Sequence, residues 1–325
     1  MPQEPNPIEI RSEKFWFQSG DVVLHVENTQ FKVHREMLSL HSNVFKDTFS
    51  MPQNADRRHL EDAFVDGCPV VPLSDKASDV EVMLSIFYYN FQKHNWRELM
   101  HIGDLSTLLR LGKKYEIDHF TKEALRRLRV DHPTTLDAWD AHDFYLAYQE
   151  IAWDDSSFDV DMCVINLAYE HSLLSILPVA YLRFLQLNSL DSIVLEEIEV
   201  CSTGRLQCIL GNARISNFIR NRLTEWCAHE VLTPGKDCST LQTCAALRLT
   251  TVDPKKFWLW AGFDAADHYS FLQPLEKIRF SGFCPACTKA IQTRYDEVRA
   301  QLWEKLPTFF GLPEWEELKK KDFDM

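Results

Sequence analysis

Four cysteines in the second half of the chain have the residue type and spacing needed for metal chemistry. They form two pairs, Cys238 with Cys244 (C-x5-C) and Cys284 with Cys287 (C-x2-C). Zinc favours four thiolates in a tetrahedron, and a C-x2-C spacing brings two sulfurs to one metal without strain. The first pair can complete the site if the segment between the pairs folds back. We therefore expect one structural Zn²⁺ bound by these four thiolates.

Other interpretations of the same cysteines stay open. The C-x5-C spacing is wider than that of the usual zinc knuckle, so Cys227 and His229 are substitute ligands. Pro285, as a first helical residue, would place Cys284 at a helix N-terminus, where a thiol pKa is lowered, and would make a redox pair. Ordinary buried thiols without a cofactor are the third interpretation. A catalytic zinc is disfavoured, because four protein ligands leave no position for water.

The elements before the cysteines begin with a compact β-β-α-α pattern over residues 21–49. Val22, Leu24 and Val26 alternate with their neighbours, as expected of a strand. Glu27 and Asn28 can turn the chain, and the alternation then resumes to form a hairpin. The period changes after the second strand to suit two short helices, the second capped by a serine. Such a unit is a scaffold, which favours binding over catalysis.

These residues resemble the opening of a BTB/POZ domain. The matching positions are Asp21, Phe31, Val33, His34, Arg35, Ser42 and Phe45. The resemblance continues through an expected strand at Cys68–Ser74, a helix at Asp79–Asn90 and a helical pair at Leu105–Leu128. With its C-terminal motif CPAC…LWEKLPTFFGLPEWEEL, the chain resembles the large fungal BTB family with a helical C-terminal region. The resemblance implies an α/β domain, a small sheet flanked by helices, in which Asp21 and His34 are structural.

The chain is long enough for two domains. We expect an N-terminal leader at residues 1–17, a BTB/POZ-like domain at 18–130 with a polar loop at Met51–Gly67, and an all-helical domain at 134–325. Pro133 marks the boundary, because the residue before a proline is pushed out of helical geometry.

Three apolar stripes indicate long helices in the second domain. The first is closed by Pro178, the second is less regular, and the third is opened by Pro285 and stopped by Pro307. They consist of Val160, Val164, Leu167, His171 and Leu174; of Leu206, Ile209, Ala213, Phe218 and Trp226; and of Ile291, Tyr295, Val298, Leu302 and Leu306.

The resemblance predicts a non-catalytic protein-protein interaction adaptor or scaffold. Its partner would be another protein, a second copy of the chain, or a cullin-type ubiquitin ligase. Cullin-binding relatives carry an acid where this chain has Gln53, two residues after Met51. Phe15, Trp16 and Phe17 are candidates for a self-association surface. The alternative function is a nuclear transcription or chromatin regulator that acts through protein contacts.

Composition excludes several other classes. A net charge of -13 disfavours direct nucleic-acid binding, which needs clustered Lys and Arg. The chain has no phosphate-binding glycine loop and no G-x-S-x-G, and Thr233 interrupts the one start of an H-E-x-x-H motif. The apolar region Leu173–Leu187 is too short to cross a membrane. Nine cysteines without an export signal predict reduced thiols in the cytoplasm or nucleus.

Overall fold

The computed structural model of the protein describes residues 9–51, 64–89, 99–141, 151–152, 160–195, 199–227, 237–251, 272 and 282–323. The chain divides into two compact units. The N-terminal unit comprises Met1–Val130 and Tyr148–Asp154, and the C-terminal unit comprises Asp131–Ala147 and Asp155–Met325.

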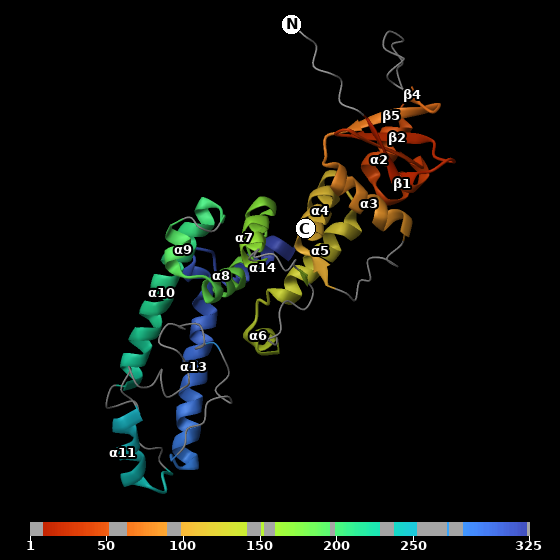
Figure 1. Cartoon of the computed structure of the whole chain (residues 1–325). Coiled ribbons are helices and arrows are strands. Elements are labelled where there is room, and N and C mark those ends of the chain that lie inside the picture. Colours follow the sequence, from red (N-terminus) through yellow and green to blue (C-terminus); the bar gives the residue numbers. More distant parts are fainter. Residues whose placement is uncertain are drawn as a thin grey trace. The chain divides into compact units, whose positions relative to one another are not determined.

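Five strands form the sheet of the N-terminal unit (Figure 1), in the order β1-β3-β2-β5-β4. They are β1 Ile10–Trp16, β2 Val22–Val26, β3 Thr29–Val33, β4 Phe64–Val65 and β5 Cys68–Leu73. β2 and β3 form the predicted antiparallel hairpin, and Glu27 turns the chain at φ 52°. β5 runs parallel to β2, so the strand predicted from Cys68 is confirmed.

The central strand β2 is buried on both of its faces. Val22, Val23, Leu24 and Val26 are all fully buried, and only His25 is partly exposed. A strand covered on both faces loses its polar alternation. β2 lies between β3 and β5 and holds the core of the sheet.

The expected leader at residues 1–17 is wrong for residues 10–16. These residues form β1, which pairs in parallel with β3. The strand exposes charged side chains and buries Phe15 completely, so it is an integral edge of the sheet. The segment Met51–Gly67 was also expected to be only a loop, yet Phe64 and Val65 form β4 against β5.

Five helices complete the main body of the N-terminal unit, as predicted. They are α1 Arg35–His41, α2 Asn43–Ser50, α3 Ala77–Tyr89, α4 Ile102–Lys114 and α5 Asp118–Asp131. Ser42 caps α2, because its Oγ accepts the N–H of Phe45 at 3.1 Å.

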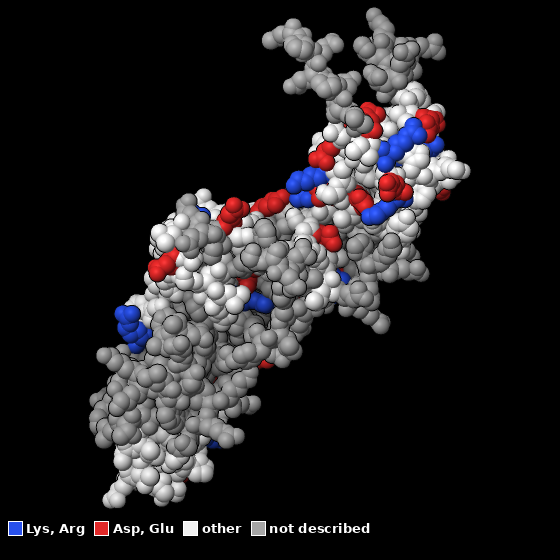
Figure 2. Space-filling model, in the orientation of Figure 1, with Lys and Arg blue, Asp and Glu red and all other residues white. Residues whose placement is uncertain are grey.

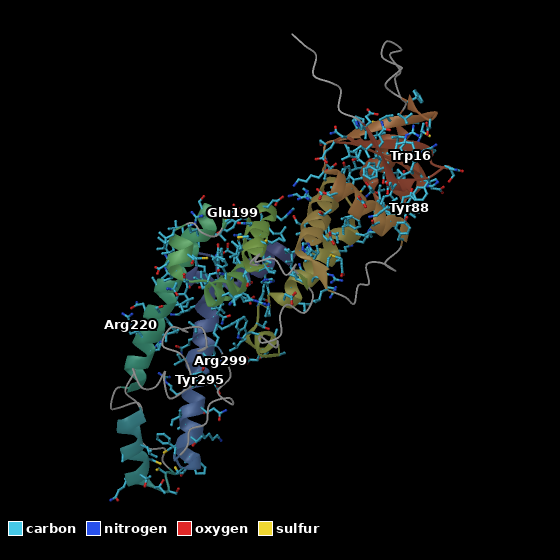
Figure 3. The ribbon with its side chains drawn as sticks, in the orientation of Figure 1. Trp16, Tyr88, Glu199, Arg220, Tyr295 and Arg299 are labelled. Carbon is cyan, nitrogen blue, oxygen red and sulfur yellow. The ribbon has the colours of Figure 1, made fainter. Side chains whose placement is uncertain are left out.

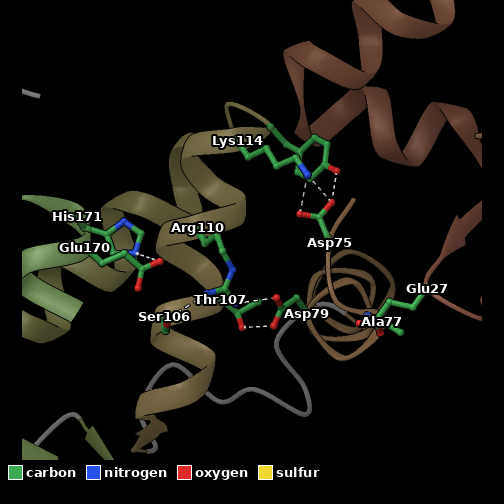
Figure 4. A network of polar contacts seen from close by, with 11 residues as sticks. Glu27, Asp75, Ala77, Asp79, Ser106, Thr107, Arg110, Lys114, Glu170 and His171 are labelled. Carbon is green, nitrogen blue, oxygen red and sulfur yellow. Dashed lines mark hydrogen bonds and ion pairs between the residues drawn. The ribbon is translucent and has the colours of Figure 1, made fainter. Parts of the chain in front are cut away.

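Buried carboxylates join α3 to α4 (Figure 4). Asp79 accepts a hydrogen bond from Thr107 Oγ1 at 2.9 Å and from Arg110 Nη2 at 2.7 Å. Asp75, just before α3, accepts from Lys114 Nζ at 2.8 Å. Charges that leave water must be paired, so these contacts fix the two helices in register.

The prediction that everything after Thr134 is helical needs one correction. β7, Ile151–Ala152, pairs in parallel with β6, Met100–His101, and belongs to the N-terminal unit. Two residues are too few to show a strand period in a sequence, which explains the error.

The described part of the C-terminal unit is helical. Its helices are α6 Leu136–Ala141, α7 Val160–His171, α8 Leu177–Leu187, α9 Leu190–Val194, α10 Ser202–Cys227, α11 Leu241–Thr251, α13 Pro285–Phe309 and α14 Trp315–Phe323. The two longest, α10 and α13, pack side by side (Figure 1).

The predicted stripes are correct for two of these helices. Ile291, Tyr295, Val298, Leu302 and Leu306 are all buried along α13, although the helix continues past Pro307 to Phe309. Val160, Val164 and Leu167 are buried in α7. α7 ends at His171, however, and Pro178 lies in the first turn of α8 rather than closing α7. Proline is favoured in that position because the first helical N–H groups have no partner.

The apolar stripe predicted for α10 is wrong, because a different face of the helix is buried. Leu206 is 54% exposed, whereas Cys208, Ile215 and Ile219 are buried. The buried face also contains Gly211, where an added Cβ would overlap the ring of Phe310. Small residues on this face allow close packing, and they weaken the apolar period from which the stripe was read.

Candidate metal centre and interaction surfaces

The four predicted cysteines meet between α11 and the start of α13. Cys238 lies just before α11 and Cys244 in its first turns, while Cys284 precedes Pro285, the first residue of α13, and Cys287 follows in the first turn. Figure 3 shows sulfur atoms gathered between the two helices. The turn into α13 includes Gly282, whose φ of +100° is rarely adopted by a residue with a side chain.

The geometry suits a single metal ion. The four sulfur atoms lie within 4.8 Å of one another, and those of Cys238 and Cys284 are 3.7 Å apart. Thiolates at about 2.3 Å from one tetrahedral zinc lie just under about 4 Å apart. Cys244, Cys284 and Cys287 are buried and Cys238 is half-buried, so one ligand reaches solvent. The four cysteines could therefore bind a Zn²⁺ ion.

Backbone and hydroxyl donors favour the thiolate form of two of these residues. The N–H of Cys287, followed by that of Ser239, lowers the pKa of the Cys284 thiol to about 5, against the opposing effect of burial. The Thr240 hydroxyl, 3.2 Å from Cys244 Sγ, is the largest cause that lowers the pKa of Cys244. The Cys284 N–H donates to the same sulfur at 3.4 Å. A thiolate is the form that binds metal.

The pKa of the Cys238 thiol moves the other way. Burial raises the pKa of Cys238 above its usual value, although the Thr240 backbone N–H opposes this shift. A bound metal would replace the proton that burial retains there. Ser239 and Thr240 were not predicted as site residues. Their position directly after Cys238 is the one local clue, and serine and threonine are too common for it to predict a site residue.

The substitute ligands Cys227 and His229 cannot be compared with this cluster. The side chain of Cys227 and the whole of His229 lie outside the described residues. The eight cysteines whose side chains the structure describes are free thiols.

The predicted self-association residues lie on the N-terminal unit. Phe15 is fully buried and is therefore wrong as a surface residue. Phe17 stacks on Tyr88 with ring centroids 4.6 Å apart, and Trp16 lies under the guanidinium of Arg11 at 4.4 Å. These side chains therefore pack on their own domain, where Figure 3 labels Trp16 and Tyr88. Self-association of the chain stays a prediction.

The predicted partner residues at the end of α2 are only partly described. Met51 is 67% exposed, and Gln53 lies outside the described residues. Leu40 in α1, which packs against α2, is 75% exposed. The N-terminal unit therefore presents two large apolar side chains to solvent, one near the end of α1 and one directly after α2.

Asp21 and His34 have structural contacts. Asp21 Oδ1 accepts the backbone N–H of Arg35 at 2.8 Å. His34 Nδ1 lies 3.0 Å from the Tyr88 hydroxyl and its Nε2 lies 3.0 Å from Ser19 Oγ. These bonds fix the junction between β3 and α1.

Charges of both signs alternate on the visible face of the N-terminal unit (Figure 2). Arg11 pairs with Asp66 at 3.1 Å, and Lys14 pairs with Glu81. These two basic side chains are paired with acids, unlike the clustered Lys and Arg of a phosphate-binding surface. No helix in the described part of the chain is both long and apolar enough to cross a membrane.

Comparison with known proteins identifies the N-terminal unit. The BTB/POZ domain family model matches residues 11–131, and this segment is a BTB/POZ domain. Its mixed sheet with helices is followed by a mainly helical C-terminal region. BTB domains mediate protein contacts and are typically non-catalytic, and no catalytic domain was found beside this one. The search of curated proteins found no match to the chain.

Proposed function

We propose that the protein is a non-catalytic adaptor or scaffold that binds other proteins through its BTB domain. The observation that carries this proposal is the BTB domain itself, at residues 11–131, together with two exposed apolar side chains on it, Leu40 in α1 and Met51 after α2. Asp21 and His34 are residue types found in active sites, but here they form hydrogen bonds with Arg35 and Tyr88 that have a structural role.

The experiment is affinity capture with the full chain and two matched variants. Leu40→Asp with Met51→Asp changes the two exposed apolar side chains of the BTB domain, and Leu206→Asp changes another exposed leucine, in α10. Partners should be lost with the first variant and kept with the second. A set of partners that is indifferent to the BTB variant, with folding confirmed by circular dichroism, would contradict the proposal.

The adaptor function has a narrower form, recruitment of a cullin-type ubiquitin ligase. Met51 at the end of α2 is exposed, as a contact residue must be. Gln53 replaces the acid of cullin-binding relatives, which weakens any contact that uses a carboxylate. Gln53→Glu should then strengthen binding to a purified cullin. If neither the wild type nor Gln53→Glu is retained by the cullin at micromolar concentration, recruitment of a ligase is excluded and the scaffold function remains.

We further propose that Cys238, Cys244, Cys284 and Cys287 bind one structural Zn²⁺. The mutual approach of the four sulfurs and the lowered pKa of Cys284 support this assignment. The ion would cross-link α11 to the start of α13, with no open position for catalysis. Cobalt substitution tests the ligand set, because tetrahedral thiolate coordination gives Co²⁺ intense visible and near-ultraviolet absorption. Absence of those bands in the Co²⁺-loaded protein would contradict it.

A further inference from the structure

Exposed aliphatic side chains gather around the short helix α9 of the C-terminal unit. Leu187, the last residue of α8, is 76% exposed, and in α9 Leu190 is 39% and Val194 is 55% exposed. Leu195, directly after α9, is 68% exposed. Leu190 and Val194 have the i, i+4 spacing of residues on one side of a helix. Large apolar side chains that face solvent together mark an interaction surface.

The helix that carries these side chains is held firmly in place. Ile193 is 1% exposed and anchors α9 in the core of the C-terminal unit. Ser189 caps the helix, because its Oγ accepts the N–H of Ser192 at 3.1 Å. Asn188 Nδ2 donates to the carbonyl of Phe184 at 3.0 Å and fixes the turn from α8. The surface is therefore formed before a partner arrives, which lowers the entropy cost of binding.

The charge around these side chains is acidic. Asp191, in the first turn of α9, and Glu199, labelled in Figure 3, are both exposed. The sequence between Arg183 and Arg205 contains no Lys, Arg or His. Arg183 points inward, because its Nε lies 3.6 Å from the carboxylate of the buried Asp161. An apolar surface with an acidic rim is complementary to an apolar surface with a basic rim.

We propose that Leu187, Leu190, Val194 and Leu195, together named the α9 surface, bind an amphipathic helical segment of another protein. The apolar face of that helix would cover the four side chains, and Lys and Arg would flank it. A second copy of the chain fits less well, because two-fold pairing would bring the acidic rims of both copies together. An anionic membrane would be repelled by the same acids.

This inference goes beyond the proposed adaptor function of the BTB domain. The α9 surface lies in the C-terminal unit, so it would give the protein a second binding site with a ligand of its own. A scaffold needs two such sites to hold two partners at once. The chemistry of the α9 surface predicts that the second partner carries a basic amphipathic helix.

The test uses the full chain and a fluorescein-labelled synthetic peptide, LKKLLKKLLKKLLKKL, which has leucine on one side of the helix and lysine on the other. Fluorescence anisotropy measures its Kd for the wild type and for Val194→Ser combined with Leu195→Ser. This double variant should raise the Kd at least about tenfold, because two apolar contacts are lost. Leu187→Ser should raise it less, and it keeps the test valid if the double variant fails to fold. Leu241→Ser, at an exposed leucine of α11, is the matched control and should leave the Kd unchanged.

The charge of the rim is tested separately. Asp191→Asn combined with Glu199→Gln should weaken binding at low salt and make the Kd less dependent on salt. A peptide with glutamate in place of every lysine should bind more weakly than the lysine peptide. Equal or tighter binding of the glutamate peptide would overturn the proposed ligand.

Two further results would overturn the proposal. One is an equal Kd for the wild type and for Val194→Ser with Leu195→Ser, or no binding to either. The other is a dimer of the wild-type chain in sedimentation velocity that this double variant abolishes, because a second copy would then occupy the α9 surface. Since the peptide is the probe, neither result depends on whether partner capture through the BTB domain succeeds.

Discussion

The BTB domain and the region where α11 meets α13 have cores of different composition. The BTB domain buries a continuous set of aliphatic and aromatic side chains around β2, among them Val22, Leu24 and Phe31. Where α11 meets α13, the buried cluster consists of Cys244, Cys284 and Cys287, with Cys238, Phe283 and Ala286 packed against it.

This difference has a physical consequence. Apolar burial stabilises the BTB domain in proportion to the area removed from water. Cysteine is a small hydrophobic residue, so four thiols supply little of that area. Metal binding supplies the missing free energy in small domains with such cores. The BTB domain should accordingly be indifferent to chelators, and the end of the C-terminal unit should depend on the ion.

The largest effect is expected from Cys284→Ser. A serine hydroxyl is a poor zinc ligand, so the variant should lose the ion. Without it, α11 and the first turns of α13 should unfold locally. Hydrogen exchange resolved by peptide should show fast exchange there and unchanged protection in β2 and α3. Cys163→Ser, in α7 and outside the cluster, is the matched control. Equal protection of α11 in both variants would mean that the cysteines are ordinary core residues.

A second large effect is expected where α13 meets α6. The buried Arg299 donates from Nη1 to Asp140 at 2.9 Å and from Nε to the carbonyl of Leu272 at 2.6 Å. Asp140→Ala leaves this charge buried and unpaired, which should cost about 3 kcal/mol of stability. Replacing both partners, Arg299→Met with Asp140→Leu, should cost less than the single change. Chemical denaturation measures both, and a larger cost for the double variant would refute the explanation.

A smaller effect is expected from Gly211→Ala in α10. The new methyl group would overlap the ring of Phe310, which is fully buried and packs against Tyr181. Overpacking of this kind costs about 1–3 kcal/mol, and the better helix propensity of alanine returns up to about 1 kcal/mol. Asn217→Ala, at an exposed position of the same helix, gains helix propensity without overpacking and should stabilise the protein by up to about 0.7 kcal/mol. Thermal unfolding that ranks the two variants equally would contradict this packing.

The smallest effect concerns pH and the BTB domain. Burial lowers the pKa of His41, which stacks on Phe87 at 4.4 Å, and it also lowers the pKa of the neighbouring His119. The unfolded chain then takes up protons more readily than the folded one. Stability is complete above the unfolded pKa of about 6.5 and falls as the pH drops below it. His41→Phe should lose less stability between about pH 7.5 and about pH 5.5 than the wild type. An equal or greater loss of stability in His41→Phe would contradict the lowered pKa of His41.

The sequence was sufficient where side-chain period and turn chemistry agreed. The hairpin of β2 and β3, the Ser42 cap and the stripe of α13 all followed from local spacing. β1 was missed because its single buried residue, Phe15, gives no period, and because its partner β3 lies beyond β2 in the sequence, out of reach of any local pattern.

The cysteine cluster could be predicted in its members and not in its surroundings. C-x2-C beside Pro285 fixed one half of the cluster, because a helix start brings those two sulfurs together. The return of Cys238 and Cys244 to the same point depends on how α11 packs near α13, which no local pattern encodes. The donors Thr240 and Ser239 act through hydrogen bonds to sulfur, and serine and threonine are too common to signal that function.

The most direct test of the account is the zinc content of the purified, reduced wild-type protein, measured by elemental analysis together with thiol titration in the native state. The account predicts about one equivalent of zinc per chain, with Cys238, Cys244, Cys284 and Cys287 protected until a strong chelator removes the ion. Well under half an equivalent of zinc, with all four thiols reacting freely before chelation, would contradict it.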